Sequence, residues 1–276
     1  MGLNSIMTNV GAMTALQTLA AINAEMLVVQ KRITTGLKVE GPRDNGGTWA
    51  IAQMYRSESS GLGQVIYSLS RGQSVVDVAL AAADGILGVV DEMRQLALEA
   101  SDFDPASEQR AMLNGEYLEL RKQVDLMAAE ASFNGVNLIS AGGTDQVRAL
   151  ADTKGGSTIN VNHEDLSMNG AALSGLRADL TGAILDTELQ AFATAQTSLT
   201  SSIWRLGSGH RMLKGYEGFI EKKRDTIDAA VGNLVDADLA KESARWQSLQ
   251  VRQQLTMQAL AIANRAPTAL LQLFRF

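Results

Sequence analysis

The sequence predicts a mainly α-helical protein: an elongated rod of long antiparallel helices in coiled-coil-like packing, with a small β-hairpin region at the outer end. Two observations predict this fold class. The chain has 276 residues and only three prolines, at positions 42, 105 and 267, so long stretches lack the residue that breaks helix interiors. Apolar residues also recur alternately four and three positions apart, which is the spacing of a coiled-coil seam.

The first helix is expected at the N-terminus, where residues 1–24 carry no charged side chain. Its predicted apolar track consists of Ile6, Val10, Met13, Gln17, Ala20, Ala24 and Leu27. The longest track predicts a second helix over residues 62–97, which Asp102, Asp104 and Pro105 then end. Its positions are Leu62, Ile66, Leu69, Gln73, Val76, Leu80, Ala83, Leu87, Val90, Arg94 and Ala97.

A third helix is expected over residues 113–131, on the track Leu113, Tyr117, Leu120, Val124, Met127 and Ala131. It should end before Phe133, Asn134 and Gly135, because Asn and Gly suit a turn that needs positive φ. Between residues 140 and 186, glycines divide the chain into short segments, and residues 158–162 (TINVN) alternate as a strand does. We therefore expect hairpins and loops in this region, at one end of the rod.

Two further helices are expected in the C-terminal part. The first follows the track Leu199, Ile203, Leu206, His210, Leu213, Glu217, Ile220, Arg224, Ile227, Val231 and Leu234. Gly207, Gly209, Gly215 and Gly218 weaken that prediction, since each costs up to about 1 kcal/mol relative to Ala in an exposed helix. The second follows Leu239, Glu242, Trp246, Leu249, Gln253, Thr256, Leu260 and Ala263, with Leu255 and Ile262 widening its apolar stripe. Asp236 and Asp238 precede it, where acidic groups favour the helix dipole.

This topology brings the two ends of the chain together, and both are apolar on one face. A pair of helices hides only one stripe of each member. Much of the remaining apolar surface must then be covered by other copies of the chain or by a partner. The pattern alone therefore predicts a rod whose base is completed by self-association.

Composition excludes several classes of function. The chain has no cysteine, which excludes thiol chemistry. It has two histidines, which leaves little for an imidazole metal site. Its formal net charge of −6 disfavours nucleic-acid binding, which usually needs an excess of basic residues. There is no P-loop, dinucleotide fingerprint or Ser-His-Asp elbow. We expect no enzyme activity and no cofactor.

Targeting signals are not recognisable in the N-terminal part. A secretory signal peptide begins with basic residues, whereas the first basic residue here is Lys31. The first 24 residues also hold too many Asn, Thr, Ser and Gln side chains to span a bilayer. We expect neither a Sec-type signal nor membrane insertion.

Several stretches, in colinear order, resemble bacterial flagellin, and the resemblance covers roughly residues 1–140 and 186–276. The short middle segment is similar to that of the compact alphaproteobacterial members. The stretches are residues 2–6 (GLNSI), 30–36 (QKRITTG), 44–46 (DNG), 71–74 (RGQS), 133–136 (FNGV), 234–244 (LVDADLAKESA), 259–264 (ALAIAN) and 270–275 (LLQLFR).

The resemblance implies a structural subunit that polymerises into the bacterial flagellar filament for motility, outside the cell, after type III export without a Sec signal. It implies a core domain of terminal helices at 1–40 and 235–276, a helical rod domain at 41–140 and 186–234, and an outward-facing segment at 141–185. The implied partners are other flagellin subunits, an export chaperone, and the cap and hook-junction proteins.

The expected assembly interface lies on the terminal helices and consists of Ile6, Val10, Met13, Leu27, Leu239, Trp246, Leu249, Leu260, Leu270 and Phe274. Flagellins are often O-glycosylated on outward Ser and Thr, which makes eight residues candidates by their location. They are Thr144, Thr153, Ser157, Thr158, Ser167, Ser174, Thr181 and Thr187.

Two other functions stay open at this point. A hook–filament junction protein shares the terminal motifs but would form a short ring zone, and a monomeric helical adhesin or receptor ligand would keep ordered termini in solution.

Within the bundle, Arg94 and Glu217 each break an apolar repeat. Either they are flanking positions in contact with solvent, or they pair across the bundle and fix its register.

Overall fold

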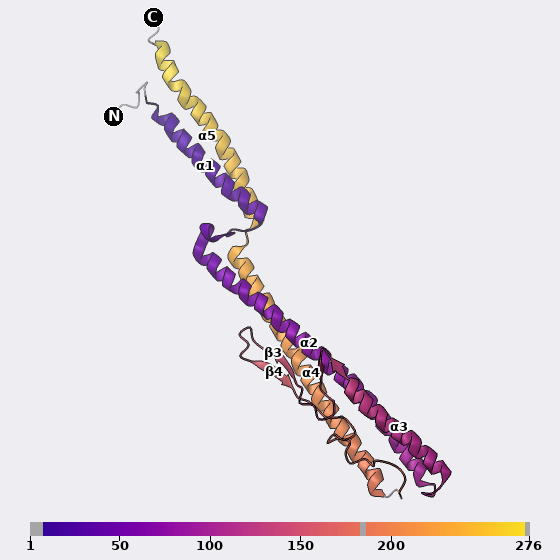
Figure 1. Cartoon of the computed structure of the whole chain (residues 1–276). Helices are drawn as coiled ribbons and strands as arrows, with labels where there is room; N and C mark the ends of the chain where they lie inside the picture. Colours follow the sequence, from indigo (N-terminus) through magenta and orange to yellow (C-terminus); the bar gives the residue numbers. More distant parts are fainter. Residues whose placement is uncertain (1–7, 183–185, 274–276) are drawn as a thin grey trace. The chain divides into compact units, whose positions relative to one another are not determined.

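The computed structural model describes the backbone of residues 8–182 and 186–273 and the side chains of residues 8–182 and 187–265. It confirms the predicted fold class of long helices with a few short antiparallel strands (Figure 1). The elements in order are α1 (Val10–Thr35), α2 (Pro42–Ser101), α3 (Glu108–Glu130), β1 (Ser132–Phe133), β2 (Val136–Asn137), β3 (Val147–Leu150), β4 (Thr158–Val161), α4 (Asp186–Val235) and α5 (Leu239–Leu273).

Local capping chemistry sets the helix ends. Asn9 begins α1, because its Oδ1 accepts the Ala12 N–H at 3.0 Å, and Gly36 ends it in the left-handed conformation at φ 71°. The predicted N-terminal role of Asp238 is confirmed, since its Oδ1 accepts the Lys241 N–H at 3.1 Å at the start of α5. The backbone of Asn45 is non-helical, and its Oδ1 caps the rest of α2 through the Thr48 N–H at 3.0 Å.

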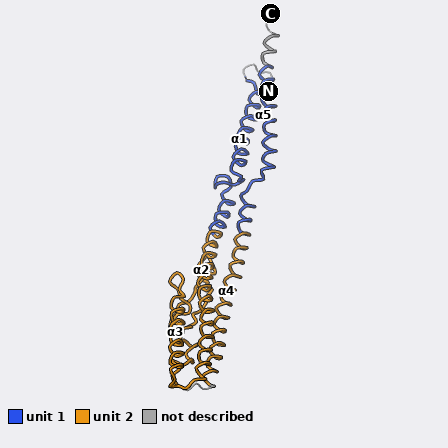
Figure 2. The backbone as a smooth tube through the Cα atoms, turned by 90° about the vertical axis from the view of Figure 1, so that its right-hand side faces the viewer, with its two compact units in different colours: residues 1–57, 227–276 blue, residues 58–226 orange. Residues whose placement is uncertain are grey.

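The chain divides into two compact units, which Figure 2 distinguishes by colour. The terminal unit comprises residues 1–57 and 227–276 and contains α1, α5, the start of α2 and the end of α4. The bundle unit comprises residues 58–226 and contains the rest of α2 and α4, α3 and all four strands.

In the bundle unit, α2 and α4 run antiparallel. Gln73 Nε2 donates to Glu217 Oε2 at 2.7 Å, and further along Gln196 donates to Asp91. The core of α2 contains the buried heptad column Leu62, Leu69, Val76, Ala83, Val90 and Ala97, as predicted. The second predicted column ran from Ile66 to Arg94 at intervals of seven. The buried residues of the second column lie one position earlier in each heptad: Val65, Ala79, Ile86, Met93 and Ala100.

This shift explains the polar residues that interrupted the predicted tracks. Arg94 is exposed, so it is a flanking position outside the seam. The proposed Arg94–Glu217 pair is wrong, because Glu217 lies level with Gln73, whereas the part of α2 near Arg94 lies level with Gln196. Some twenty residues of helix, or roughly 30 Å, separate Arg94 from Glu217.

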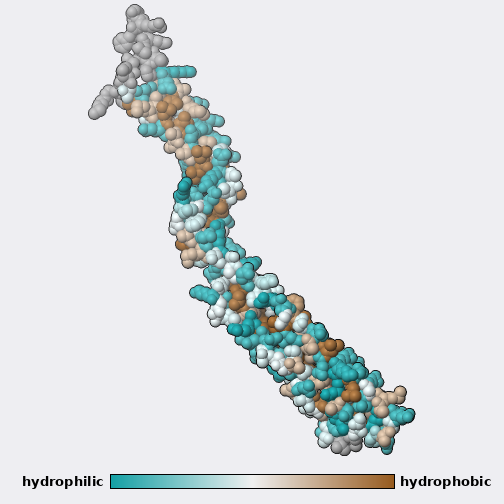
Figure 3. Space-filling view, viewed as in Figure 1, coloured by the Kyte–Doolittle hydropathy of each residue, from teal (hydrophilic) through white to brown (hydrophobic). Residues whose placement is uncertain are grey.

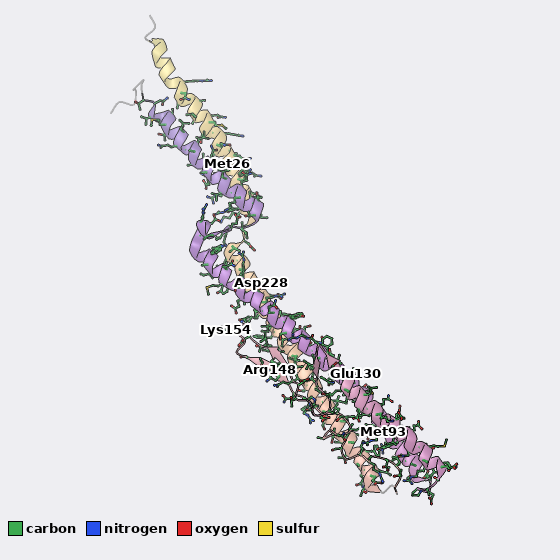
Figure 4. All side chains as sticks on the ribbon, in the orientation of Figure 1. Met26, Met93, Glu130, Arg148, Lys154 and Asp228 are labelled. Carbon is green, nitrogen blue, oxygen red and sulfur yellow. The ribbon has the colours of Figure 1, made fainter. Side chains whose placement is uncertain are left out.

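Two hairpins interrupt the helices. In the first, β1 and β2 flank the predicted Asn-Gly turn, whose residues adopt positive φ at Asn134 (53°) and Gly135 (79°). In the second, the predicted strand at residues 158–162 is confirmed as β4, and it pairs antiparallel with β3, which the sequence analysis missed. In Figure 4, Arg148 lies on β3 and Lys154 at the hairpin tip.

The second hairpin lies along the sides of α2 and α4, and three glycines make room for it. A Cβ on Gly72 would lie 2.9 Å from Val147 Cγ1, one on Gly209 would lie 2.8 Å from the Val161 methyl carbons, and one on Gly61 would meet Thr153. The glycines that weakened the prediction for α4 therefore leave the helix continuous, and Gly209 serves close packing of the hairpin.

The chain that follows β4 runs along α3. Tyr117 donates its hydroxyl to the Arg177 carbonyl at 2.9 Å, and Asn114 Oδ1 accepts the Leu180 N–H at 2.7 Å. The buried guanidinium of Arg110 donates to three backbone carbonyls, those of Phe103, Leu180 and Gly182. These bonds fasten the non-helical segment to the start of α3.

Candidate functional site

The terminal unit contains a helix pair with a thin apolar seam. Ile22 and Val29 of α1 and Leu249 of α5 are buried together, and Met26, Ile33 and Trp246 pack against them. Met26 is labelled on α1, beside α5, in Figure 4. The remaining seam positions of α5 include Glu242, Gln253 and Thr256, so apolar burial along the pair is limited.

Polar side chains complete this seam and fix its antiparallel register. Asn9 Nδ2 donates to the Ala263 carbonyl at 2.7 Å, and Gln253 Nε2 donates to Asn23 Oδ1 at 2.7 Å. At the opposite end of the pair, Arg32 Nη1 donates to Glu242 Oε1 at 3.1 Å. A further ion pair joins Arg245 to Glu25, and it raises the pKa of the Arg245 guanidinium through its hydrogen bond.

A second apolar stripe lies on the side of α1 that faces away from α5. Val10, Met13 and Leu27 are exposed on it, and Leu27 exposes 68% of its surface. Leu16 and Val28 extend the stripe. Residues 27 and 29 are two positions apart and so point to sides of the helix about 160° apart, which explains how one helix has both a buried and an exposed apolar face.

The helix α5 has a similar stripe. Val251, Leu255 and Ile262 are exposed on one side, and Ile262 exposes 71% of its surface. Figure 3 shows hydrophobic patches between hydrophilic side chains on the surface of the terminal helices. Contiguous exposed apolar stripes of this kind are typical of surfaces that another macromolecule covers.

The predicted interface residues fall into two groups. Val10, Met13, Leu27 and Leu239 are exposed. Trp246 and Leu249, by contrast, lie in the seam between α1 and α5, and Leu260 is half-buried. Ile6 and Phe274 lie outside the described residues, as does the side chain of Leu270. The sequence analysis missed four exposed residues, Leu16, Val28, Val251 and Met257, because its tracks followed one stripe per helix.

The link between α1 and α2 is held by charge. Lys31 Nζ lies 2.8 Å from Glu40 and 3.4 Å from Asp44. The backbone N–H groups of Glu40 and Gly41 donate to Asp44 Oδ2, at 3.0 and 3.2 Å, and lower the pKa of that carboxyl. The Gly41–Pro42 turn is thereby closed by Asp44.

Other kinds of site find little support in the part of the chain that the structure describes. No group of three or more His, Cys, Asp or Glu side chains there could hold a metal ion. A groove of about 700 Å³ in the terminal unit is lined by both acidic and basic side chains, with Arg32, Lys38 and Asp238 among them. By length and composition alone, α1 and α2 are apolar enough to cross a membrane.

The candidate glycosylation residues also divide by exposure. Thr144, Thr153, Ser157, Thr158, Ser174, Thr181 and Thr187 are exposed. Ser167 is the exception, because it is 2% exposed and its hydroxyl donates to Asp165 Oδ1 at 2.7 Å. A transferase cannot reach Ser167 in this fold, which removes it from the candidates.

Comparisons with known proteins agree with the sequence motifs. The bacterial flagellin N-terminal helical region matches residues 6–144, and the bacterial flagellin C-terminal helical region matches residues 189–274. Flagellin FljK of Caulobacter vibrioides is 42% identical over 275 residues, covering 100% of both chains. A flagellin of Brucella melitensis is 31% identical, covering 98% of this chain and 99% of its own.

One solved structure shares the fold. It is a putative flagellar hook-associated protein from Vibrio parahaemolyticus, which matches with a TM-score of 0.58 and 14% identity, over 70% of this chain and 100% of its own. At that identity the likeness concerns the fold alone.

Proposed function

The chain belongs to the bacterial flagellin family and is a structural subunit of the flagellar filament, and we propose that it joins the filament by burying the exposed stripes of α1 and α5 against neighbouring copies. The observation that supports this proposal is that α1 has two apolar faces and α5 covers only one of them. The interface on this proposal includes Val10, Met13, Leu27 and Leu239 as direct contacts. Trp246, Leu249 and Leu260 would act by holding α1 and α5 together. Ile6, Leu270 and Phe274 remain part of the proposed interface.

The energetics favour assembly over a solvated helix pair. Fully burying one large aliphatic side chain contributes about 1.5–3 kcal/mol, so a few such residues on each copy give a substantial driving force. Part of it is offset by ordering the helices, whose seam is thin and partly polar. The α1–α5 pair would be weakly held in the monomer and well packed in the polymer. Ordering of the terminal unit would then be coupled to assembly.

The division into domains follows from the same proposal. Residues 1–40 and 235–276 would form the core domain of the filament, residues 41–140 and 186–234 the helical rod domain, and residues 141–185 the outward-facing segment. The exposed Ser and Thr candidates of that segment, together with Thr187 just after it, are the proposed positions of O-glycosylation. Comparing the intact mass of native filaments with the sequence mass tests this, since equal masses would exclude modification.

The route to the filament is also part of the proposal. Membership of the flagellin family supports export through the flagellar type III apparatus. The partners on that route would be an export chaperone, the cap and the hook-junction proteins. Bilayer insertion is not proposed, because α1 carries polar side chains such as Asn23 and Gln30 within its apolar stretch.

Seeded polymerisation tests the proposed interface. Leu27→Asp places a charge in the centre of the exposed α1 stripe. Thr18→Asp places one at an exposed position about 180° around α1 from Leu27. We expect Leu27→Asp to prevent elongation from filament seeds, as seen by electron microscopy, while Thr18→Asp elongates as the unchanged chain does. Normal elongation of Leu27→Asp would contradict the proposal, and binding of the monomer to liposomes through the same stripe would point to a membrane instead.

A further inference from the structure

An exposed face of α4 in the bundle unit combines large apolar and basic side chains. Trp204, Met212 and Phe219 are spaced eight and then seven residues apart, so they project from one side of the helix, and they are 65%, 50% and 56% exposed. The exposed side chains of Arg211 and Lys222 lie on the same side. We call this surface the α4 face.

An exposed face of α3 has the opposite charge. Met112 and Leu126 are its apolar residues, and Met112 exposes 76% of its surface. The exposed carboxylates on the same side of the helix are those of Glu108, Glu116, Glu119 and Glu130. Glu119 forms only a solvent-exposed ion pair with Lys122, at 2.6 Å, and such pairs contribute little. We call this surface the α3 face.

The two helices run in the same direction. The helix α4 is antiparallel to α2 through the Gln73–Glu217 and Asp91–Gln196 pairs, and α3 turns back along α2, with Met127 packed against Gly85. Both α3 and α4 are therefore antiparallel to α2 and parallel to each other. In a polymer whose copies share one orientation, α3 of one copy can lie parallel to α4 of the next.

We propose that the α3 face of one copy packs against the α4 face of the neighbouring copy in the filament. This inference rests on the filament function and concerns the bundle unit, which the proposal for α1 and α5 leaves out. In a parallel register that sets Met112 against Trp204, Glu119 comes opposite Arg211 seven residues later. The charges then meet at the centre of the contact, where they set the register and exclude wrong pairings.

The rest of the contact follows from the same register. Leu126 comes within one position of Phe219, and Glu130 comes opposite Lys222. The apolar pairs lie about 21 Å apart, because fourteen residues of helix separate Met112 from Leu126. Two apolar contacts with one pair of opposite charges between them and a second pair beyond Leu126 make the two faces complementary over about five turns.

This register also predicts how neighbouring copies are offset. Within one copy, Met127 lies beside Gly85, and the α2–α4 pairs place Gly85 level with about residue 203 of α4. In the proposed contact, Met127 lies level with Phe219 of the neighbour. The sixteen residues between these levels correspond to a stagger of about 24 Å along the helices. Different faces of the two copies meet, so the contact repeats from copy to copy as a helical filament requires.

Disulfide crosslinking tests the contact directly, because the chain has no cysteine of its own. A Glu119→Cys chain is mixed with an Arg211→Cys chain, polymerised on filament seeds and oxidised. We expect a crosslinked dimer at least about tenfold more abundant than in the control mixture of Ala111→Cys with Arg211→Cys. Ala111 is exposed on α3, but in this register it lies eight residues, or about 12 Å, along the helix from the position opposite Arg211.

A charge exchange gives a second measurement. Glu119→Arg and Arg211→Glu should each raise the critical concentration for polymerisation about tenfold, and the double variant should return it to within about threefold of the unchanged chain. Asp84→Arg, an exposed change on α2, controls for the gain of two positive charges in Glu119→Arg. Circular dichroism of the monomers checks that each variant keeps its helices.

The outcomes separate this inference from the filament function. If filaments form but the Glu119→Cys and Arg211→Cys mixture crosslinks no better than the control, the α3–α4 contact is overturned and the filament function stands. If the double exchange is no better than either single change, the Glu119–Arg211 pairing is wrong. Failure of the unchanged chain to elongate seeds would count against the filament function itself.

Discussion

Val161 of β4 lies so close to Gly209 of α4 that a Cβ on the glycine would be 2.8 Å from both valine methyl carbons. A valine side chain is short and stiff, so it cannot move aside cheaply. Two positions earlier, Gly207 has no atom within 4 Å of its own Cβ position. Two glycines of one helix, almost adjacent in sequence, therefore differ in their structural role.

This difference predicts opposite effects of the same substitution. Gly209→Ala should lower the free energy of unfolding by about 1–3 kcal/mol, because the added methyl overpacks the hairpin contact. Gly207→Ala should raise it by up to about 1 kcal/mol through helix propensity. Urea denaturation of the two monomers measures both values. Equal effects of the two changes would show that the hairpin does not pack on Gly209.

Arg110 supports a second prediction. Its guanidinium is buried and binds the carbonyls of Phe103, Leu180 and Gly182, so Arg110→Met leaves one buried and two partly buried acceptors without this donor. Each unpaired group costs about 1–3 kcal/mol, and we expect a total loss of about 2–4 kcal/mol. Thermal unfolding measures it.

The control for Arg110 is Lys122→Met, which removes a solvent-exposed cation from the same helix. It should change the stability by less than about 0.5 kcal/mol. An equally small effect of Arg110→Met would contradict the fastening role of the guanidinium. Faster hydrogen exchange confined to the non-helical segment along α3 would support it.

The ion pair between Glu164 and Arg205 predicts a dependence on pH. Burial alone would raise the pKa of Glu164. The hydrogen bonds from Arg205, at 2.6 Å, and from the Ser202 hydroxyl lower it by more than burial raises it, so the pKa lies below the ordinary value of 4.5. A carboxyl whose pKa is depressed by folding stabilises the fold above its unfolded pKa. That stability is lost as the pH falls from about 4.5 through the lower folded value.

Comparison with Glu164→Gln measures this contribution. The variant keeps the shape of the side chain but does not titrate, so its melting temperature should fall less steeply between pH 6 and pH 3 than that of the unchanged chain. At pH 7 the variant should be the less stable of the two. Superimposable pH profiles would exclude a stabilising role for the ion pair.

The terminal helices allow seam and stripe to be separated experimentally. Leu249 is buried between α1 and α5, whereas Val251, two residues later, is 55% exposed. Leu249→Ala should lower the local stability of the helix pair by about 2–4 kcal/mol, measured by hydrogen exchange in the monomer. Val251→Ala should leave monomer exchange unchanged and raise the critical concentration for polymerisation. Identical behaviour of the two variants would contradict the assignment of two faces to α5.

The periodic spacing in the sequence predicted the helices but only half of the α2 seam. The column from Leu62 to Ala97 was right, yet Ile66 and Leu80 were chosen over Val65 and Ala79. Both choices are apolar and adjacent in sequence, so hydrophobicity alone cannot distinguish them. The deciding factor is the helix that packs against α2, and that partner is not visible in the spacing.

The same reason explains the result on α1. The predicted track through Val10, Met13 and Leu27 is apolar, but it lies on the exposed side, while Ile22 and Val29 face α5. Strand β3 was missed because four residues carry too little alternation to stand out among glycines. The helix caps at Gly36 and Asp238 were predictable, because their chemistry is local.

The seating of the hairpin on glycines of two different helices has a mechanical consequence. Val147 rests on Gly72 of α2 and Val161 rests on Gly209 of α4, while the two valines are paired with each other across the sheet. Sliding α2 along α4 by a single residue, about 1.5 Å, would replace a glycine under one valine by a residue with a Cβ. The hairpin therefore fixes the register of α2 relative to α4. It makes the bundle stiff against shear, so that a force applied along α2 is passed to α4 without sliding.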